Sequence, residues 1–372
     1  MKRLDTHLLF PALVVGFALS ASGAASHPLD TWHTRQPASD SGDLLGVCHG
    51  KGLFVAVGLH GTILTSSTGE TWNVQSSGTT VWLVSVTSGN GVFVAVGEAG
   101  VVLSSEDGMN WTTQASGVIT DLFAVEFGSG LFVTTGRDVI LTSSDGISWA
   151  RQTSTVSLGS AFRHIVYGNG HFFVPGHSGS NVISLDGTNW IAQSTDLVYR
   201  PALYAVGFGA GRFMIINNHV QVFSSKDAIH WTQQASLTGY RQPAIAYGSG
   251  HFVTGSGGQM DYSRDGSAWT SAPAACLPRD ICYGNGTFVA VGYRKAIVQS
   301  DPLVYLETVA PGTLEISGPA DRTYRIDSRD WARPGDAWVS RTNFTLHTSP
   351  LVWSDPEQYP PPQRFYRAVA DP

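Results

Sequence analysis

The feature that most constrains the fold of this 372-residue chain is a repeat with a period near 40 residues. A seven-residue segment of the pattern Ser-x-Asp-Gly-x-x-Trp, here called the box, occurs six times, with its tryptophans 38 to 41 residues apart. The boxes are residues 66–72, 105–111, 143–149, 184–190, 225–231 and 263–269. A period of this length, divided into four short strands, is typical of the blades of a β-propeller.

A second element, Gly-x-Gly followed by a short apolar run, recurs in phase with the box. Its seven copies begin at Gly50, Gly89, Gly128, Gly168, Gly209, Gly248 and Gly284. We expect its glycines to supply the positive φ that a tight hairpin needs. In the second repeat the pattern predicts strands A to D at 83–88, 92–97, 101–105 and 111–115. Seven hairpins predict seven blades.

The seventh repeat lacks a box tryptophan, because it reaches Asp301 and then meets Pro302. An unmatched tryptophan, Trp32, lies 40 residues before Trp72. We therefore expect Trp32–Gln36 to supply strand D of blade seven, which would close the ring and protect its edges. The predicted fold class is all-β: a seven-bladed β-propeller closed by an N-terminal strand and followed by a small C-terminal β-domain.

Segments outside the repeat predict export and a second domain. Residues 1–25 combine a basic start, an apolar run at 8–19 and small residues at 22–24, which is the pattern of a signal peptide. We expect a periplasmic, cell-surface or extracellular protein that begins near Ser26. The propeller would occupy 26–302, and alternating apolar and polar residues over 303–372 predict a small β-sandwich-like domain. Docking, surface attachment and capping would each suit that domain.

Charge and cysteine content exclude several classes of partner and scaffold. The net charge of −6 and the lack of a basic stripe argue against nucleic acid, and no stretch after the signal is long enough to span a membrane. Three cysteines allow at most one intramolecular disulfide. Cys48 and Cys282 share a register in blades one and seven, and Cys276–Cys282 is the competing pair. No metal-ligand spacing or cofactor motif is present, so we expect neither a metal nor a cofactor.

The box itself is expected to be structural. Its Asp can accept backbone N–H bonds from its own turn, and its Gly suits a positive φ. Its Trp can bury its ring between blades. The repeat resembles the Asp-box, or BNR, repeat of sialidase-like propellers, whose pattern is Ser-x-Asp-x-Gly-x-Thr-Trp. Here Gly follows Asp directly, and Thr68 and Ala228 replace the Asp of the first box and the Gly of the fifth. The resemblance implies that any ligand site lies on the face opposite the boxes.

That opposite face would carry the B–C turns and the D–A connections between blades. From blade four onward each connection contains an arginine near strand A, with tyrosines close by. The candidate ligand-binding residues are Arg163, Arg200, Arg241, Arg279, Tyr199, Tyr240, Trp82 and His164. Guanidinium groups pair with carboxylates and aromatic rings stack on sugars, so the pattern predicts an acidic glycan or a protein as partner. Solvated arginines paired with nearby aspartates are the alternative interpretation.

The carboxylates favour a non-catalytic role. Only Glu70, Glu98, Glu106 and Glu126 are glutamates of the propeller, and no pair can be placed at the separation that a glycosidase needs. Asp280 occupies a channel position that is otherwise mostly small. The sequence therefore predicts an exported binding or interaction propeller without catalytic residues. A sialidase-type glycoside hydrolase and an assembly factor similar to the photosystem II stability/assembly propellers are the alternatives.

Overall fold

The computed structural model describes residues 27–36, 42–152, 164–176, 181–193, 203–238 and 244–303, and, in the C-terminal part, 305–310, 313–317, 322–330, 339–346, 351–356 and 364–370. The chain divides into two compact units, a propeller at Ser26–Leu303 and a C-terminal unit at Val304–Pro372. The described regular structure consists of β-strands and single turns of 3-10 helix.

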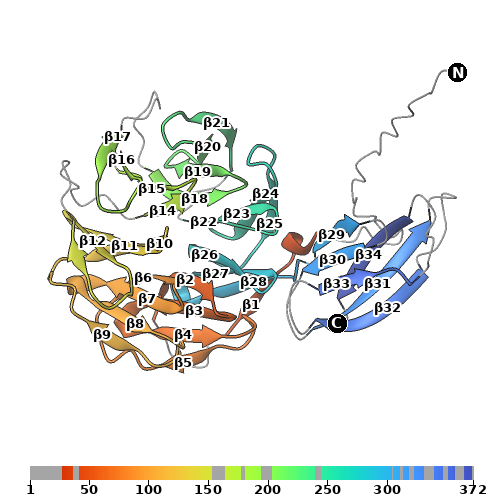
Figure 1. Ribbon diagram of the computed structural model, residues 1–372, viewed down its shortest axis with the longest axis horizontal. Helices are drawn as coiled ribbons and strands as arrows, with labels where there is room; N and C mark the ends of the chain where they lie inside the picture. The colour runs from red at the N-terminus through yellow and green to blue at the C-terminus, as the bar shows by residue number, and fades with distance from the viewer. Residues whose placement is uncertain are drawn as a thin grey trace, which may run out of the picture. The chain divides into compact units, whose positions relative to one another are not determined.

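Seven four-stranded sheets form the blades of the propeller (Figure 1). Blade one contains β2 (Leu44–Gly50), β3 (Leu53–Gly58), β4 (Ile63–Ser66) and β5 (Asn73–Gln75). Blade two contains β6 (Leu83–Gly89), β7 (Val92–Gly97), β8 (Val102–Ser105) and β9 (Thr112–Gln114). Blade three contains β10 (Leu122–Gly128), β11 (Leu131–Gly136), β12 (Val139–Ser143) and β13 (Ala150–Arg151). Blades four and five contain β14 (Val166–Gly168), β15 (His171–Val174), β16 (Asn181–Ser184) and β17 (Ile191–Gln193); β18 (Leu203–Gly209), β19 (Arg212–Asn217), β20 (Gln221–Ser225) and β21 (Thr232–Ser236). Blades six and seven contain β22 (Ile245–Gly248), β23 (His251–Ser256), β24 (Gln259–Ser263) and β25 (Thr270–Pro273); β26 (Pro278–Gly284), β27 (Thr287–Gly292), β28 (Ile297–Ser300) and β1 (Trp32–Arg35). The predicted seven-bladed all-β fold is confirmed.

The N-terminal strand closes the ring as expected. Strand β1 pairs antiparallel with β28, so that Trp32 lies opposite Ser300 and Arg35 opposite Ile297. A 3-10 turn, η1 (Pro28–Asp30), precedes it and places Leu29 fully buried in the core of blades six and seven. The indole N–H of Trp32 donates to the carbonyl oxygen of Leu29 at 2.9 Å. Blade seven thus joins strands from the two ends of the propeller.

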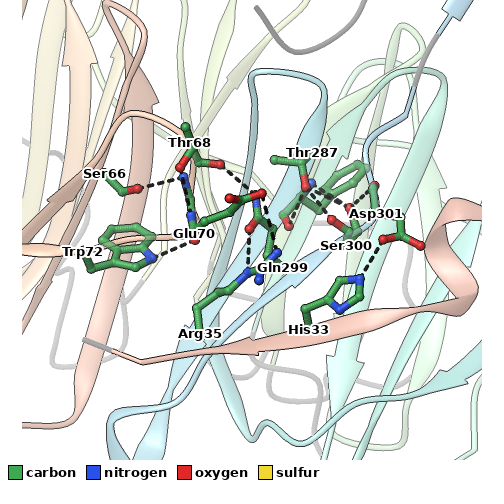
Figure 2. A network of polar contacts seen from close by, with 12 residues as sticks. His33, Arg35, Ser66, Thr68, Glu70, Trp72, Thr287, Gln299, Ser300 and Asp301 are labelled. Carbon is green, nitrogen blue, oxygen red and sulfur yellow. Dashed lines mark hydrogen bonds and ion pairs between the residues drawn. The ribbon is translucent and has the colours of Figure 1, made fainter. Parts of the chain in front are cut away.

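A chain of side-chain hydrogen bonds crosses this closure and reaches blade one (Figure 2). His33 Nε2 lies 2.6 Å from Asp301 Oδ1, and Arg35 Nε donates to Gln299 Oε1 at 2.9 Å. Gln299 Nε2 in turn donates to the carbonyl oxygen of Thr68 at 2.8 Å. Thr68 belongs to the first box, where it replaces the Asp. The one box without the aspartate is therefore supported by a residue of blade seven.

The remaining boxes form compact turns. In the second box, Asp107 Oδ1 accepts the backbone N–H groups of Met109 and Asn110, each at 2.8 Å, and these bonds hold the pKa of Asp107 well below its usual range. The indole N–H of Trp111 donates to the carbonyl oxygen of Gly108 at 2.9 Å. Strand β9 begins at Thr112, one residue after the predicted start at Trp111. The box thus ties its aspartate and its tryptophan to a single turn.

The box tryptophans also contact the preceding blade. Trp190, in the fourth blade, is 2% exposed and packs in one core cluster with Val133 and Ile140 of blade three. Trp72 packs in the same way with Val289 and Val291 of blade seven. Each of these rings therefore fills the space between two blades.

The two glycines of each Gly-x-Gly hairpin have different functions. In blade two the middle residue, Asn90, has φ +46° and the second glycine, Gly91, has φ +76°. The first glycine has no positive φ, so that part of the expectation was wrong. Its constraint is the next blade, because a Cβ on Gly89 would lie 2.0 Å from Cγ of Phe127. Equivalent contacts run around the whole ring: His49 over Gly284, Ser88 over Gly50, Tyr167 over Gly128, Phe208 over Gly168, Tyr247 over Gly209 and Tyr283 over Gly248.

The C-terminal unit contains two three-stranded sheets. The first has the order β29 (Tyr305–Ala310), β30 (Thr313–Ser317), β33 (Leu351–Ser354), and the second has the order β32 (Val339–Leu346), β31 (Arg322–Asp330), β34 (Arg364–Ala370). Leu314 and Ile316 of the first sheet share a core with Ile326 of the second. The two sheets therefore bury one apolar face against each other.

Candidate functional site

The first strands of the blades surround a central channel. A cavity of about 710 Å³ is lined by residues of β2, β6, β10, β14, β18, β22 and β26. Its polar and thiol lining residues include Cys48, Glu126, His164, Asp280 and Cys282. Blades five and six contribute small residues such as Gly207 and Ala246 beside the larger Phe208 and Tyr247. The predicted ligand-binding residue His164, the predicted channel residue Asp280 and the glutamate Glu126 thus line one cavity.

Asp280 is engaged with the backbone of its own and the next blade. Its Oδ2 accepts the N–H of Val47 at 2.9 Å, and its Oδ1 accepts the N–H of Ile281 at 2.9 Å. Burial raises the pKa of Asp280 to about 6, while these bonds and Arg279 act in the opposite direction. Ser85 makes the same inter-blade contact, accepting the N–H of Val125 at 3.2 Å. The geometry explains Asp280 as a contact between blades seven and one.

Glu126 has a different environment. Its Oε1 accepts the N–H of the following residue, Phe127, at 3.1 Å. Burial raises the pKa of Glu126 to about 8, and the neighbouring Asp280 adds to the shift. The side chain keeps some accessible surface, but that surface faces the channel. At neutral pH the carboxyl group is therefore mainly protonated.

Arg279 lies where the connection into blade seven meets the channel. Its guanidinium carbon is 5.4 Å from the ring centroid of Tyr293, and its Nη1 donates to the Tyr293 hydroxyl at 3.3 Å. Its Nε is buried and has no hydrogen-bond partner among the described residues. Tyr293 belongs to the B–C turn of blade seven, η5 (Tyr293–Lys295), and is 43% exposed. Tyr293 is not among the residues predicted from the sequence, although the sequence places an aromatic residue in that turn.

A second cavity, of about 550 Å³, begins at Tyr293. Its described lining includes Arg35, Arg294 and Lys295 together with Leu277, and contains no acidic side chain. Arg35 is also engaged by Gln299 and lies 3.9 Å from Glu70. Tyr293 therefore lies between Arg279, which lines the channel, and the three cations that line this second cavity.

Two aspartates of the same face are structural. Asp43 Oδ1 accepts the backbone N–H of Arg294 at 2.7 Å, and Asp121 Oδ1 accepts that of Ala99 at 3.1 Å. Each bond joins a D–A connection to the B–C turn of the preceding blade.

Trp82 occupies the comparable place in blade two. Its carbonyl oxygen accepts the N–H of Glu98 at 3.0 Å, and the residue is 41% exposed. The predicted aromatic surface residue Trp82 is therefore accessible.

The other predicted ligand-binding residues lie outside the described part of the chain: Arg163, Tyr199, Arg200, Tyr240 and Arg241. Whether they join Arg279 on one surface stays a prediction. Among the described residues, no three His, Cys, Asp or Glu side chains are grouped so that they could hold a metal ion. In the same part of the chain, no helix is long and apolar enough to cross a membrane.

The propeller is similar to solved structures in fold. Neither a protein-family model nor a curated protein matches the chain. A structure of YCF48 bound to D1 peptide superposes with a TM-score of 0.61 at 17% identity and covers 76% of this chain and 99% of that chain. YCF48 from Cyanidioschyzon merolae gives 0.57 at 17% identity, covering 72% and 98%. The WD40 propeller domain of Doa1 gives 0.59 at 11% identity, covering 72% and 94%. At these identities the likeness shows the fold.

Proposed function

We propose that this chain is an exported, non-catalytic propeller that binds an acidic segment of another protein through the face that carries Arg279 and Tyr293. The observation that carries the proposal is the cavity beside Tyr293, whose described lining includes three cations and an exposed Leu277 and no acidic side chain. Arginine and lysine side chains attract carboxylates, and exposed tyrosine and leucine side chains offer apolar contact to a peptide.

Arg279 extends this surface toward the channel. Contact with the aromatic ring restricts the conformations of the guanidinium group before any ligand binds. A ligand carboxylate would therefore bind an already oriented group, which lowers the entropy cost of binding. YCF48, a propeller of similar fold, has been observed with a D1 peptide bound, which supports a peptide as the class of ligand.

The carboxylates of this face support a binding role rather than a hydrolytic one. Asp43, Asp121 and Asp280 each accept backbone N–H bonds that join neighbouring blades. A carboxylate held in this way is poorly placed to act as a nucleophile or a general acid.

We also propose that the box is a shortened form of the Asp-box, because its aspartate accepts the backbone N–H groups of its own turn.

The test is a binding screen of the purified full chain on immobilised acidic peptides, run beside sialylated and uronate-containing glycans and fluorogenic glycosides. We expect binding to acidic peptides that is weakened by Arg279→Ala and by Tyr293→Ala. Lys226→Ala is the matched control, since Lys226 is an exposed cation of a box on the opposite face. Binding to glycans alone, or turnover of a glycoside, would overturn the proposal.

A further inference from the structure

The residues that precede β1 dock on blade six through a histidine side chain. Residues 27–31, here called the latch, contain η1 and lead directly into β1, the strand that closes the ring. The ring of His27 stacks on that of Tyr262 in β24, with centroids 4.8 Å apart, and makes an edge contact with His251 of β23 at 5.0 Å. The latch is therefore held against blade six by a cluster of rings.

Hydrogen bonds fix both imidazole rings in their neutral form. Nδ1 of His27 accepts the backbone N–H of Leu29 at 3.2 Å, so this nitrogen carries no proton. Nε2 of His251 accepts an N–H from Arg264 Nε at 3.1 Å, and its Nδ1 donates to the carbonyl oxygen of Ser249 at 2.7 Å. A protonated imidazole has two donors and no acceptor. Neither ring can therefore gain a proton without losing one of these hydrogen bonds.

The charges around His27 also oppose its protonation. Arg264, which donates to His251, already places a cation beside the two rings. Burial, and then His251, lower the pKa of His27 to about 4, and burial also lowers the pKa of His251. Asp30 acts in the opposite direction, but its oxygens are engaged: Oδ1 accepts the Tyr262 hydroxyl at 2.6 Å and Oδ2 accepts the backbone N–H of His27 at 2.7 Å.

The remaining groups near the latch leave this balance unchanged. Strands β25 and β28 also pack against η1, and neither carries a titratable side chain. The Cys276 thiol shares the buried core of Leu29, and burial raises its pKa to about 12. In β1, a proton on His33 would strengthen its contact with Asp301. Acid therefore acts against the latch and in favour of the contact that follows it in the chain.

The latch covers the core between blades six and seven. Leu29 is fully buried in that core together with Phe288. The indole N–H of Trp32 donates to the carbonyl oxygen of Leu29 at 2.9 Å. Trp111 makes the same bond to Gly108, three residues earlier, in the second box. The latch thus takes the place of the box that blade seven lacks, and its release would uncover apolar side chains.

We propose that the latch is an acid-sensitive switch: protonation of His27 and His251 releases residues 27–31 from blade six and uncovers the core at the closure of the ring. The pKa of His27 in the docked latch lies below the value of about 6.5 for a free histidine. Docking is therefore strongest above about pH 6.5 and weakens as the pH falls toward 4. This inference rests on the contacts with blade six and is independent of the proposed binding function.

The experiment measures amide hydrogen exchange of the full chain at pH 7 and pH 5, corrected for the intrinsic rate at each pH and resolved into peptides by mass. The amides of Leu29 and Asp30 are bonded within the latch, so they report its docking. We expect peptides that cover residues 29–32 to lose protection about tenfold or more at pH 5, while peptides of blades one to three keep theirs.

His27→Asn is the matched variant, because an asparagine side chain can also accept the Leu29 N–H but does not titrate. It should remove most of the pH effect, whereas the control His33→Asn should retain it. Equal protection of residues 29–32 in the wild type at both pH values would overturn the proposal, and so would an equal loss in all blades. The full pH effect in His27→Asn would also overturn it. The wild-type outcomes decide the question even if His27→Asn does not fold.

Discussion

His33 and Asp301 join the two ends of the propeller: Nε2 of His33 lies 2.6 Å from Oδ1 of a residue 268 positions later in the chain. Both side chains are 42% exposed, so this contact contributes about 0–1 kcal/mol. The backbone ladder between β1 and β28 and the burial of Leu29 are the stronger contributions. The closure therefore depends mainly on packing and on backbone pairing.

We predict that deleting residues 26–38 lowers Tm sharply, because β28 would then present an unpaired edge. Within that segment, Leu29→Ala should reduce the free energy of unfolding by about 2–5 kcal/mol, whereas His33→Ala should cost no more than about 1 kcal/mol. Urea unfolding followed by tryptophan fluorescence measures the three changes. A deletion variant with the melting curve of the full chain would show that β1 does not close the ring.

Two adjacent carboxylates of the second box provide a matched pair of variants. Asp107→Ala removes the acceptor of two backbone N–H groups and should cost about 1–2 kcal/mol. Glu106→Ala, at an exposed neighbouring position, should change stability by less than about 0.5 kcal/mol. Equal losses in the two variants would contradict the turn geometry.

The same bonds predict an acid dependence. Because the pKa of Asp107 is lowered in the folded chain, its contribution is present above the unfolded pKa of about 3.9 and is lost as the pH falls through the folded value. The difference in stability between the wild type and Asp107→Ala should therefore shrink in acid. Unfolding curves recorded at neutral pH and in acid measure it, and a difference that does not change with pH would contradict this assignment.

Glu126 predicts the opposite pH dependence. Its raised pKa, about 8, means that its contribution to stability is complete below the unfolded pKa of about 4.3 and is lost as the pH rises through 8. The neighbouring Asp280, with a pKa of about 6, contributes in the same direction at lower pH. Glu126→Gln should accordingly raise Tm by a few degrees in alkaline buffer and leave it nearly unchanged in acid. A Tm difference of the same size at both pH values would count against a protonated Glu126.

The N-terminal residues predict processing during export. When the 372-residue chain is expressed with a functional secretion pathway, we expect the mature protein to begin near Ser26. Intact-mass analysis of the secreted or periplasmic fraction gives the first residue directly. Recovery of the chain only inside the cell, with Met1 retained, would contradict export.

The sequence predicted the number of blades and the closing strand because these follow from counting: seven hairpins, six boxes and one extra tryptophan. It did not predict that the first glycine of each hairpin is fixed by the next blade, as Gly89 is by Phe127. It also did not identify Tyr293 beside Arg279. These contacts join different turns or different blades, and their register is set by the packing of the ring rather than by local sequence.

The most direct test of the proposed binding surface is the dissociation constant of the full chain for an acidic peptide taken from the screen, measured for the wild type, Arg279→Ala and Lys226→Ala. The proposed face predicts that Arg279→Ala weakens binding about tenfold or more, a change of roughly 1.4 kcal/mol. Lys226→Ala, which removes the same charge from the box face, should remain close to the wild type. Equal weakening in both variants, or no weakening in either, would contradict the assignment of the site to Arg279 and Tyr293.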